Sequence, residues 1–209
     1  MPLFRYKNNE FYYIHIPRTG GRFVRKLLKV NYITAKYNNF NEYYEDKWGI
    51  GLSKYCGWEL PHLHFPLYNK LEGVSQSKKF TIVRHPLTRF KSCVKEWIYY
   101  YKLKEDFFND KFTEEKFLLI MEHETEETYH SMMLPQSRFV DEESLIWKYE
   151  DGFGEDFITW LNLNLNLNIS MKKFDYERRG YDEMHPIISD KVLSLAEKFY
   201  KKDYEIFGY

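Results

Sequence analysis

Residues 13–28 read Tyr-Ile-His-Ile-Pro-Arg-Thr-Gly-Gly-Arg-Phe-Val-Arg-Lys-Leu-Leu. The stretch begins as an apolar, β-favouring strand, passes through a glycine turn opened by Pro17, and ends as an amphipathic helix. Such a strand–turn–helix aims backbone N–H groups and the positive end of a helix dipole at one point. Arg18 and Arg22 add two positive charges there. We therefore expect the turn to bind the 5′ end of a nucleotide; the alternative is an ordinary structural turn.

The same pattern occurs a second time in the chain. Residues 79–84 predict a largely apolar strand, as expected of a buried parallel strand, and a helix is predicted from Pro86 to about Leu103. Arg84 lies at the end of this strand and Ser92 two turns into the helix, so a guanidinium and a hydroxyl are available to a phosphate. Open parallel sheets bind ligands at the carboxyl ends of their strands. The two turns together predict a nucleotide with phosphates at its 5′ and 3′ positions.

Two strand–turn–helix units predict an α/β fold. We expect a single domain over residues 1–209, with a central, mainly parallel sheet flanked by helices. The Leu-Asn alternation over residues 161–168 is interpreted as a helix end and loop, with a short edge strand as the alternative. The other predicted elements are a helix beginning at Thr113, a strand over residues 144–149, and helices over residues 155–163 and 189–200.

The composition suits a globular protein without a general attraction for polyanions. Hydrophobic residues make up 44% of the 209 residues, enough for a sizeable core. The 31 basic and 31 acidic residues cancel, so neither nucleic acid nor a membrane surface is an expected partner. Cys56 and Cys93 lack metal-ligand spacing and are expected to be reduced thiols, and no metal is expected.

The expected location follows from the apolar segments. No apolar run approaches the length of about 20 residues that a membrane span needs. The first residues contain no apolar segment of the kind found in signal peptides. We therefore expect a cytoplasmic protein.

The glycine turn differs from the phosphate loop of ATPases and kinases. That loop places four residues between its first glycine and a Gly-Lys-Ser/Thr sequence, whose hydroxyl binds magnesium. Residues 17–21 form a shorter turn without Gly-Lys-Ser/Thr. A small nucleotide kinase is therefore the weaker alternative, and a single 5′ phosphate carrying a sulfuryl group fits the turn better.

Three motifs follow one another along the chain. Residues 17–21 are Pro-Arg-Thr-Gly-Gly, residues 62–65 are His-Leu-His-Phe, and residues 83–92 contain Val-Arg-x-Pro-x-x-Arg-x-x-Ser. They resemble, in turn, the 5′-phosphosulfate loop, the His-x-His segment and the 3′-phosphate element of sulfotransferases that use 3′-phosphoadenosine 5′-phosphosulfate (PAPS). The His-x-His segment is typical of the uronyl 2-O-sulfotransferase branch. Further similarity to the carbohydrate sulfotransferases lies at residues 136–139, 148–150 and 203–209.

The resemblance implies a fold, a cofactor and a reaction. The fold would be the P-loop-NTPase-like sulfotransferase fold, and the cofactor would be PAPS, used without a metal. The sulfuryl group of PAPS would pass to a hydroxyl group by in-line displacement. The acceptor would be a small molecule or a glycan, with a carbohydrate hydroxyl favoured. The resemblance indicates no oligomeric state.

The resemblance also assigns roles to individual residues. Arg18 would stabilise the oxygen that bridges sulfur and phosphorus, and His64 would be the base that takes the acceptor proton, with His62 as second choice. Arg84 and Ser92 would hold the 3′ phosphate. The full set of expected cofactor-binding residues is Arg18, Thr19, Gly20, Gly21, Arg22, Phe23, Arg84 and Ser92.

Three positions depart from the family pattern. Arg18 stands where the family has lysine, Arg22 where it has a hydroxyl residue, and His85 where aspartate is common. An arginine donates through a planar fork, whereas a lysine presents a compact ammonium group. A second hypothesis is therefore a catalytically impaired protein of the same fold that binds a nucleotide or a glycan.

Overall fold

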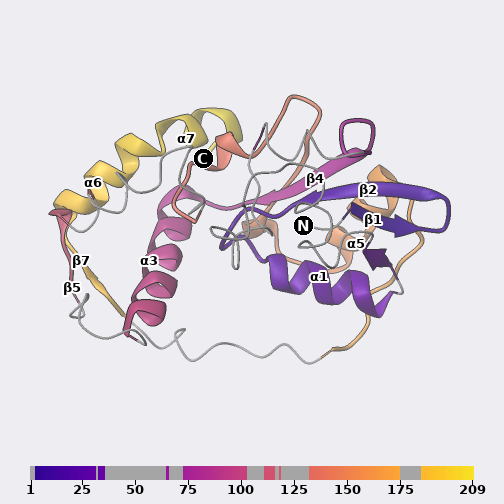
Figure 1. Cartoon of the computed structure of the whole chain (residues 1–209), viewed down its shortest axis with the longest axis horizontal. Helices are drawn as coiled ribbons and strands as arrows, with labels where there is room; N and C mark the ends of the chain where they lie inside the picture. Colours follow the sequence, from indigo (N-terminus) through magenta and orange to yellow (C-terminus); the bar gives the residue numbers. More distant parts are fainter. Residues whose placement is uncertain are drawn as a thin grey trace, which may run out of the picture.

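Five strands form the central sheet of the protein, in the order β3-β1-β2-β4-β6 (Figure 1). The computed structural model describes residues 3–31, 33–35, 65, 73–102, 111–115, 118, 132–174 and 185–209. The strands are β1 (Leu3–Tyr6), β2 (Asn9–Ile14), β3 (Thr34–Ala35), β4 (Lys78–Val83) and β6 (Leu145–Lys148).

The sheet is mixed. Strands β2, β4 and β6 are parallel neighbours, and they are the three strands predicted from the sequence. Strand β1 pairs antiparallel with both β2 and β3. The hairpin between β1 and β2 turns at Lys7, which has a φ of 53°. The α/β class and the parallel arrangement of the predicted strands are confirmed, whereas the antiparallel edge was not predicted.

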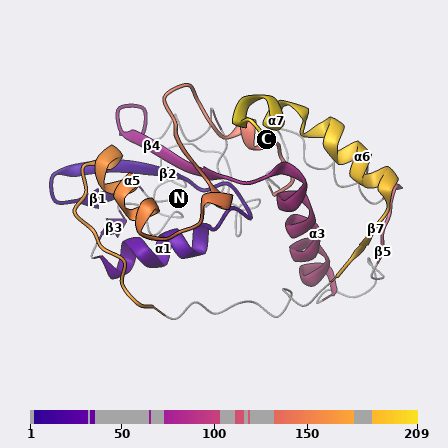
Figure 2. The ribbon, with the colours of Figure 1, turned by 180° about the vertical axis from the view of Figure 1, so that it is seen from behind.

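The helices lie in two groups around the sheet. Figures 1 and 2 show α1 and α5 together beside the sheet, and α3 with α6 and α7 at its other end. The helices whose bounds lie within the described residues are α1 (Gly21–Val30), α3 (Pro86–Lys102), α5 (Glu155–Leu165), α6 (Asp190–Phe199) and α7 (Lys201–Phe207). Two 3₁₀ turns, η4 (Gln136–Arg138) and η5 (Tyr149–Asp151), and a small parallel sheet of β5 (Lys111–Phe112) and β7 (Ile187–Ile188) complete the described elements.

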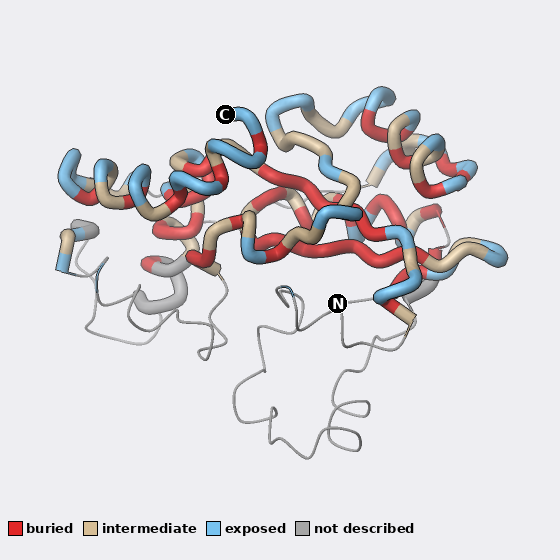
Figure 3. The backbone as a smooth tube through the Cα atoms, turned by 90° about the horizontal axis from the view of Figure 1, so that it is seen from above, coloured by how far each residue is buried: buried red, intermediate tan, exposed pale blue. Residues whose placement is uncertain are grey.

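Both faces of the sheet are covered, as Figure 3 shows by the buried residues that follow the strands. On β2, Phe11 and Tyr13 belong to the cluster formed with α1 and α5. Tyr12 and Ile14 belong to the opposite cluster, which includes residues 134 and 139 and Phe207 of α7. Since side chains alternate along a strand, an apolar β2 can fill two cores at once. A third cluster joins α3 to α6 and contains Phe90, Cys93, Val94, Ile98, Met133, Val192, Ala196 and Tyr200.

In the C-terminal half, the structure decides between the two interpretations of residues 161–168 and shows one helix that was not predicted. Helix α5 continues to Leu165 and ends at Asn166, whose φ of 52° is left-handed, so the helix-end interpretation is confirmed and the edge strand is wrong. Helix α7 was not predicted. The predicted helix at residues 189–200 is confirmed as α6, which Ser189 caps by accepting the N–H of Val192 at 3.2 Å. Among the described residues, no helix combines the length and apolar character that crossing a lipid bilayer requires.

Candidate functional site

Three turns meet at one edge of the sheet because β2, β4 and β6 are parallel and adjacent. We call them the first turn (residues 15–20, after β2), the second turn (residues 84–85, after β4) and the third turn (η5, after β6). The first two carry the predicted anion-binding residues. The sheet topology therefore brings both motifs to the same place.

Arg18 in the first turn reaches across to helix α3. Its Nε donates to the Oγ of Ser92 at 2.9 Å, and its Nη1 forms an ion pair with the Oε2 of Glu96 at 3.0 Å. The Arg18 side chain is 18% exposed and that of Glu96 13% exposed. The backbone of Arg18 has a φ of 68°, a left-handed conformation that costs energy for a residue other than glycine. The guanidinium is thus already charge-compensated by a carboxylate of the same chain.

Arg84 connects all three turns. Its Nη1 donates to the carbonyl oxygen of Arg18 at 3.3 Å, and its Cζ lies 4.4 Å from the centre of the Tyr149 ring in the third turn. Its Nε is buried and has no hydrogen-bond partner among the described residues. A buried donor without a partner is costly, so an acceptor that reached this group would stabilise it.

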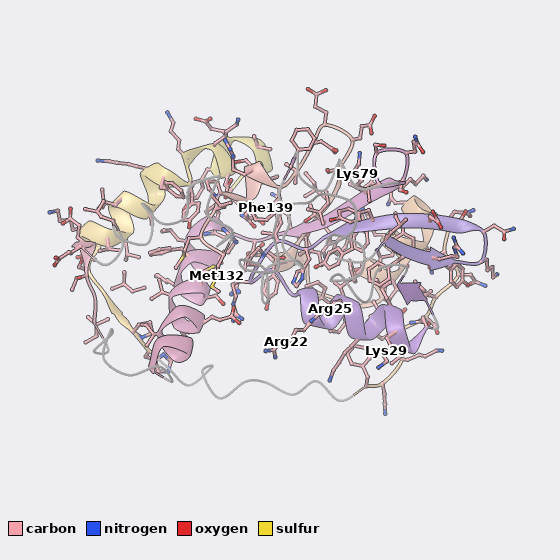
Figure 4. All side chains as sticks on the ribbon, viewed as in Figure 1. Arg22, Arg25, Lys29, Lys79, Met132 and Phe139 are labelled. Carbon is pink, nitrogen blue, oxygen red and sulfur yellow. The ribbon has the colours of Figure 1, made fainter. Side chains whose placement is uncertain are left out.

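Of the other predicted cofactor-binding side chains, Thr19 lies in the first turn, and Arg22 and Phe23 lie at the start of α1. The buried hydroxyl of Thr19 donates to the carbonyl of Ile16 at 2.8 Å, so it serves the turn itself. The Phe23 ring stacks on Phe153 at 4.9 Å. Arg22 lies at the end of α1 nearest α3 (Figure 4), and its Nη2 is buried without a partner in the described part of the chain. Thr19 and Phe23 therefore offer only their backbone to a ligand.

The two glycines are required by close neighbours. Gly20 has a φ of 94°, and a Cβ at this position would lie 2.6 Å from the Cζ of Phe153. A Cβ on Gly21 would overlap the imidazole of His15, which is buried directly beneath it. No acidic residue lies in the first turn of α1. Within α1 itself, no carboxylate therefore opposes the positive end of the helix dipole.

Gly21→Ala is expected to lower the free energy of unfolding by about 1–3 kcal/mol, the usual cost of overpacking, because its methyl group collides with His15. Chemical denaturation measures the change. Gly154→Ala is the matched control, since a Cβ there meets nothing within 4 Å. His15→Ala should suppress the effect in the double variant. A Gly21→Ala protein as stable as the wild type would contradict this account of the turn.

Arg89 is a fourth arginine of the site, and it is fully buried. Its guanidinium donates to three backbone carbonyls: Pro17 at 3.0 Å, Leu134 at 2.9 Å and Met132 at 2.7 Å. It therefore ties the first turn to the segment that leads into η4. The sequence motif contains Arg89, but we predicted no role for it.

Glu96 was also missed by the sequence prediction. It lies four residues after Ser92 on α3, and residues at this spacing share one face of a helix. That spacing was the available signal. It would have placed a carboxylate next to any group bound by Ser92.

The predicted base and its neighbour, His64 and His62, lie outside the described residues, as does Cys56. Phe65, the described residue nearest to them in sequence, donates its N–H to the carbonyl of Arg138 in η4 at 3.1 Å. Cys93 is buried and unoxidised.

The third turn is linked to the C-terminal residue. Glu150 accepts the N–H of His85 at 2.9 Å and the hydroxyl of Tyr209 at 2.8 Å. Burial and the Glu150 carboxylate raise the pKa of Tyr209, so its hydroxyl remains a donor to Glu150. These contacts fix the backbone immediately after Arg84.

The arrangement as a whole suits an anionic ligand, because it gathers arginines and the N-terminal end of α1 at one edge of the sheet. In the described part of the chain, no three His, Cys, Asp or Glu side chains gather closely enough to hold a metal ion. Comparison of the chain with protein-family models, curated protein sequences and solved structures finds no match.

Proposed function

We propose that this protein is a PAPS-dependent sulfotransferase with a P-loop-NTPase-like sulfotransferase fold, acting on a hydroxyl group, in particular that of a carbohydrate. The observation that carries the proposal is the contact between the two motifs. The Nε of Arg18 bonds Ser92, and Arg84 bonds the Arg18 carbonyl, although 74 and 66 residues separate the partners. Two anion-binding motifs in direct contact suit a ligand with phosphates at two positions.

The residues fit such a ligand. Within the described residues, the Nε of Arg84 and the Nη2 of Arg22 are buried without a hydrogen-bond partner, and the first turn of α1 contains no acidic residue. The 5′ group would lie on the backbone of residues 19–23 and on Arg18. The 3′ phosphate would lie on Arg84 and Ser92. Bidentate and charge-assisted hydrogen bonds of this kind are the strong ones for phosphate.

The proposed mechanism gives each residue a separate task. When bound, PAPS supplies an activated sulfuryl group, which is transferred with cleavage of its bond to the bridging oxygen. Arg18 neutralises the charge that develops on that oxygen. A ring nitrogen of His64, or else of His62, takes the proton of the acceptor hydroxyl. The protein otherwise acts by holding donor and acceptor in line.

The second candidate is a binding protein of the same fold without transferase activity. The ion pair between Arg18 and Glu96 favours it, since this arginine stands where the family has lysine and is held by an internal carboxylate. A nucleotide that binds must compete with Glu96 for Arg18. A protein in which Glu96 keeps Arg18 would bind the nucleotide and transfer nothing.

Two measurements test the proposal. Calorimetry with 3′,5′-bisphosphoadenosine should show binding without magnesium. Incubation with ³⁵S-labelled PAPS and a panel of saccharide and phenol acceptors should then yield a labelled product, and alanine variants of His62 and His64 should identify the base. Binding without transfer would favour the second candidate. Absence of both would overturn the proposal, and magnesium-dependent consumption of ATP would indicate a kinase.

Glu96→Gln is expected to tighten the binding of 3′,5′-bisphosphoadenosine by roughly tenfold, about 1.4 kcal/mol. The ligand no longer competes with a carboxylate for Arg18, and charge-assisted hydrogen bonds are worth about 1.5–3 kcal/mol. Titration calorimetry measures the difference. Glu142→Gln makes the same charge change at an exposed position and should have little effect. Equal or weaker binding by Glu96→Gln would show that the ion pair does not oppose the ligand.

A further inference from the structure

Gln136 is a fully buried polar residue at the start of η4, and both ends of its side-chain amide bind the backbone of Arg84. Its Oε1 accepts the N–H of Arg84 at 2.9 Å, and its Nε2 donates to the carbonyl of Arg84 at 2.7 Å. Strand β4 ends one residue earlier, at Val83. The amide of Gln136 therefore pairs with residue 84 as a further strand would, and holds both its backbone groups in place.

Gln136 is itself fixed from the C-terminal end of the chain. The carboxylate of Asp203 in α7 is fully buried and accepts two backbone N–H groups, that of Gln136 at 2.8 Å and that of Ser137 at 2.8 Å. A carboxylate that accepts two N–H groups at the start of a 3₁₀ turn fixes both the position and the direction of that turn. A continuous chain of hydrogen bonds thus runs from α7 through η4 to residue 84.

The chain of hydrogen bonds ends at Arg84, whose Nε is buried and has no hydrogen-bond partner in the part of the chain that the structure describes. Arg84 contacts the Arg18 carbonyl and the Tyr149 ring through its side chain, but its backbone N–H and C=O are bound by Gln136. A guanidinium binds phosphate in a defined orientation, so a small displacement of its backbone removes the bidentate geometry. In enzymes, a displacement of about 1 Å of a positioning group can lower the rate of the reaction a hundredfold.

We propose that Gln136 is a positioning residue of the nucleotide site, which holds Arg84 where its guanidinium meets the 3′ phosphate, and that Asp203 holds Gln136. The inference rests on the proposed function. Under this proposal, α7 supports the binding site through Asp203 without itself contacting the ligand. The alternative is that the same bonds contribute only to stability.

The test separates positioning from stability by comparing two ligands. Gln136→Met keeps the approximate volume of the side chain and removes both bonds to Arg84. Its affinity for 3′,5′-bisphosphoadenosine should fall about ten- to a hundredfold. Its affinity for adenosine 5′-monophosphate, which lacks the 3′ phosphate, should change less than about twofold. A general loss of stability would lower the affinity for both ligands to the same extent.

The control is a similar amide clamp elsewhere in the fold. Asn162 of α5 accepts the N–H of Ile169 at 3.0 Å and donates to the carbonyl of Ile169 at 2.9 Å. Asn162→Leu should lower stability and leave both affinities unchanged. If Gln136→Met does not fold, Asp203→Asn, which alters the support of η4 more mildly, should show the same selective loss.

The outcomes are distinct. A wild-type protein that does not prefer the bisphosphate would overturn the proposed nucleotide site and this role with it. A wild-type preference that persists unchanged in both Gln136→Met and Asp203→Asn would overturn the positioning role alone.

Discussion

Arg89→Met is expected to lower the free energy of unfolding by about 3–5 kcal/mol, because its guanidinium is fully buried and donates to three backbone carbonyls. Methionine fills much of the space of arginine but donates no hydrogen bond. The buried carbonyls of Pro17 and Leu134 then lose the donor that Arg89 supplied, at about 1–3 kcal/mol for each group left unsatisfied. The carbonyl of Met132 loses one of two donors and keeps the Sγ of Cys93 at 3.2 Å. Chemical denaturation of the purified variants measures the loss.

Arg25→Met is the control for this substitution, because Arg25 is exposed on α1 (Figure 4). It should change stability by less than about 0.5 kcal/mol. Arg89→Lys should be nearly as destabilising as Arg89→Met, since one ammonium group cannot reproduce three bonds of a planar fork. An Arg89→Met protein within about 1 kcal/mol of the wild type would mean that the three carbonyls find other partners.

Arg84→Ala is expected to weaken the binding of 3′,5′-bisphosphoadenosine by about 2–4 kcal/mol, or about 30- to 1,000-fold. The reason is the loss of a charge-assisted contact at a desolvated position, because the Nε of Arg84 is buried and no described residue accepts its hydrogen bond. Titration calorimetry on wild type and variant measures the difference. Adenosine 5′-monophosphate should bind both proteins alike, because it lacks the group that Arg84 would hold.

Arg138→Ala removes an exposed arginine from neighbouring η4 and should leave both affinities unchanged. Arg84→Lys should recover only part of the binding, since a lysine is a point charge and cannot bind phosphate bidentately. Binding of the bisphosphate by Arg84→Ala as tight as that of the wild type would remove Arg84 from the site.

The sequence predicted the parts of the fold that have strong local patterns. The apolar runs of β2 and β4 and the helices that follow them lie within a few residues of their expected positions. The antiparallel pairing of β1 was missed because Leu3–Tyr6 is too short to show a period. Helix α7 was missed because its seven residues place only two buried side chains, Asp203 and Phe207, toward the protein.

The sequence could predict those site residues that are charged or polar and lie at or near a turn that follows a strand. Arg18 and Arg84 could be chosen because each follows a strand at a turn, and Ser92 because it lies two turns into the helix after Arg84. Their direct contact could not be predicted, and neither could the parts played by Glu96, Gln136 and Asp203. Their hydrogen bonds join residues 52–78 positions apart. A buried polar contact between distant elements leaves no periodic signal in the sequence.

The side chains of Arg89, Arg84 and Arg18 together determine how far apart the first and second turns lie. Arg89 bonds the carbonyl of Pro17, Arg84 bonds that of Arg18, and Arg18 bonds the hydroxyl of Ser92, so the first turn is attached to the second turn and α3 by side chains alone. None of these bonds needs a ligand. The bonds of Arg89 and Arg84 to the carbonyls of the first turn therefore set the separation between the turns when the protein folds. Any ligand that contacts both turns must match this separation.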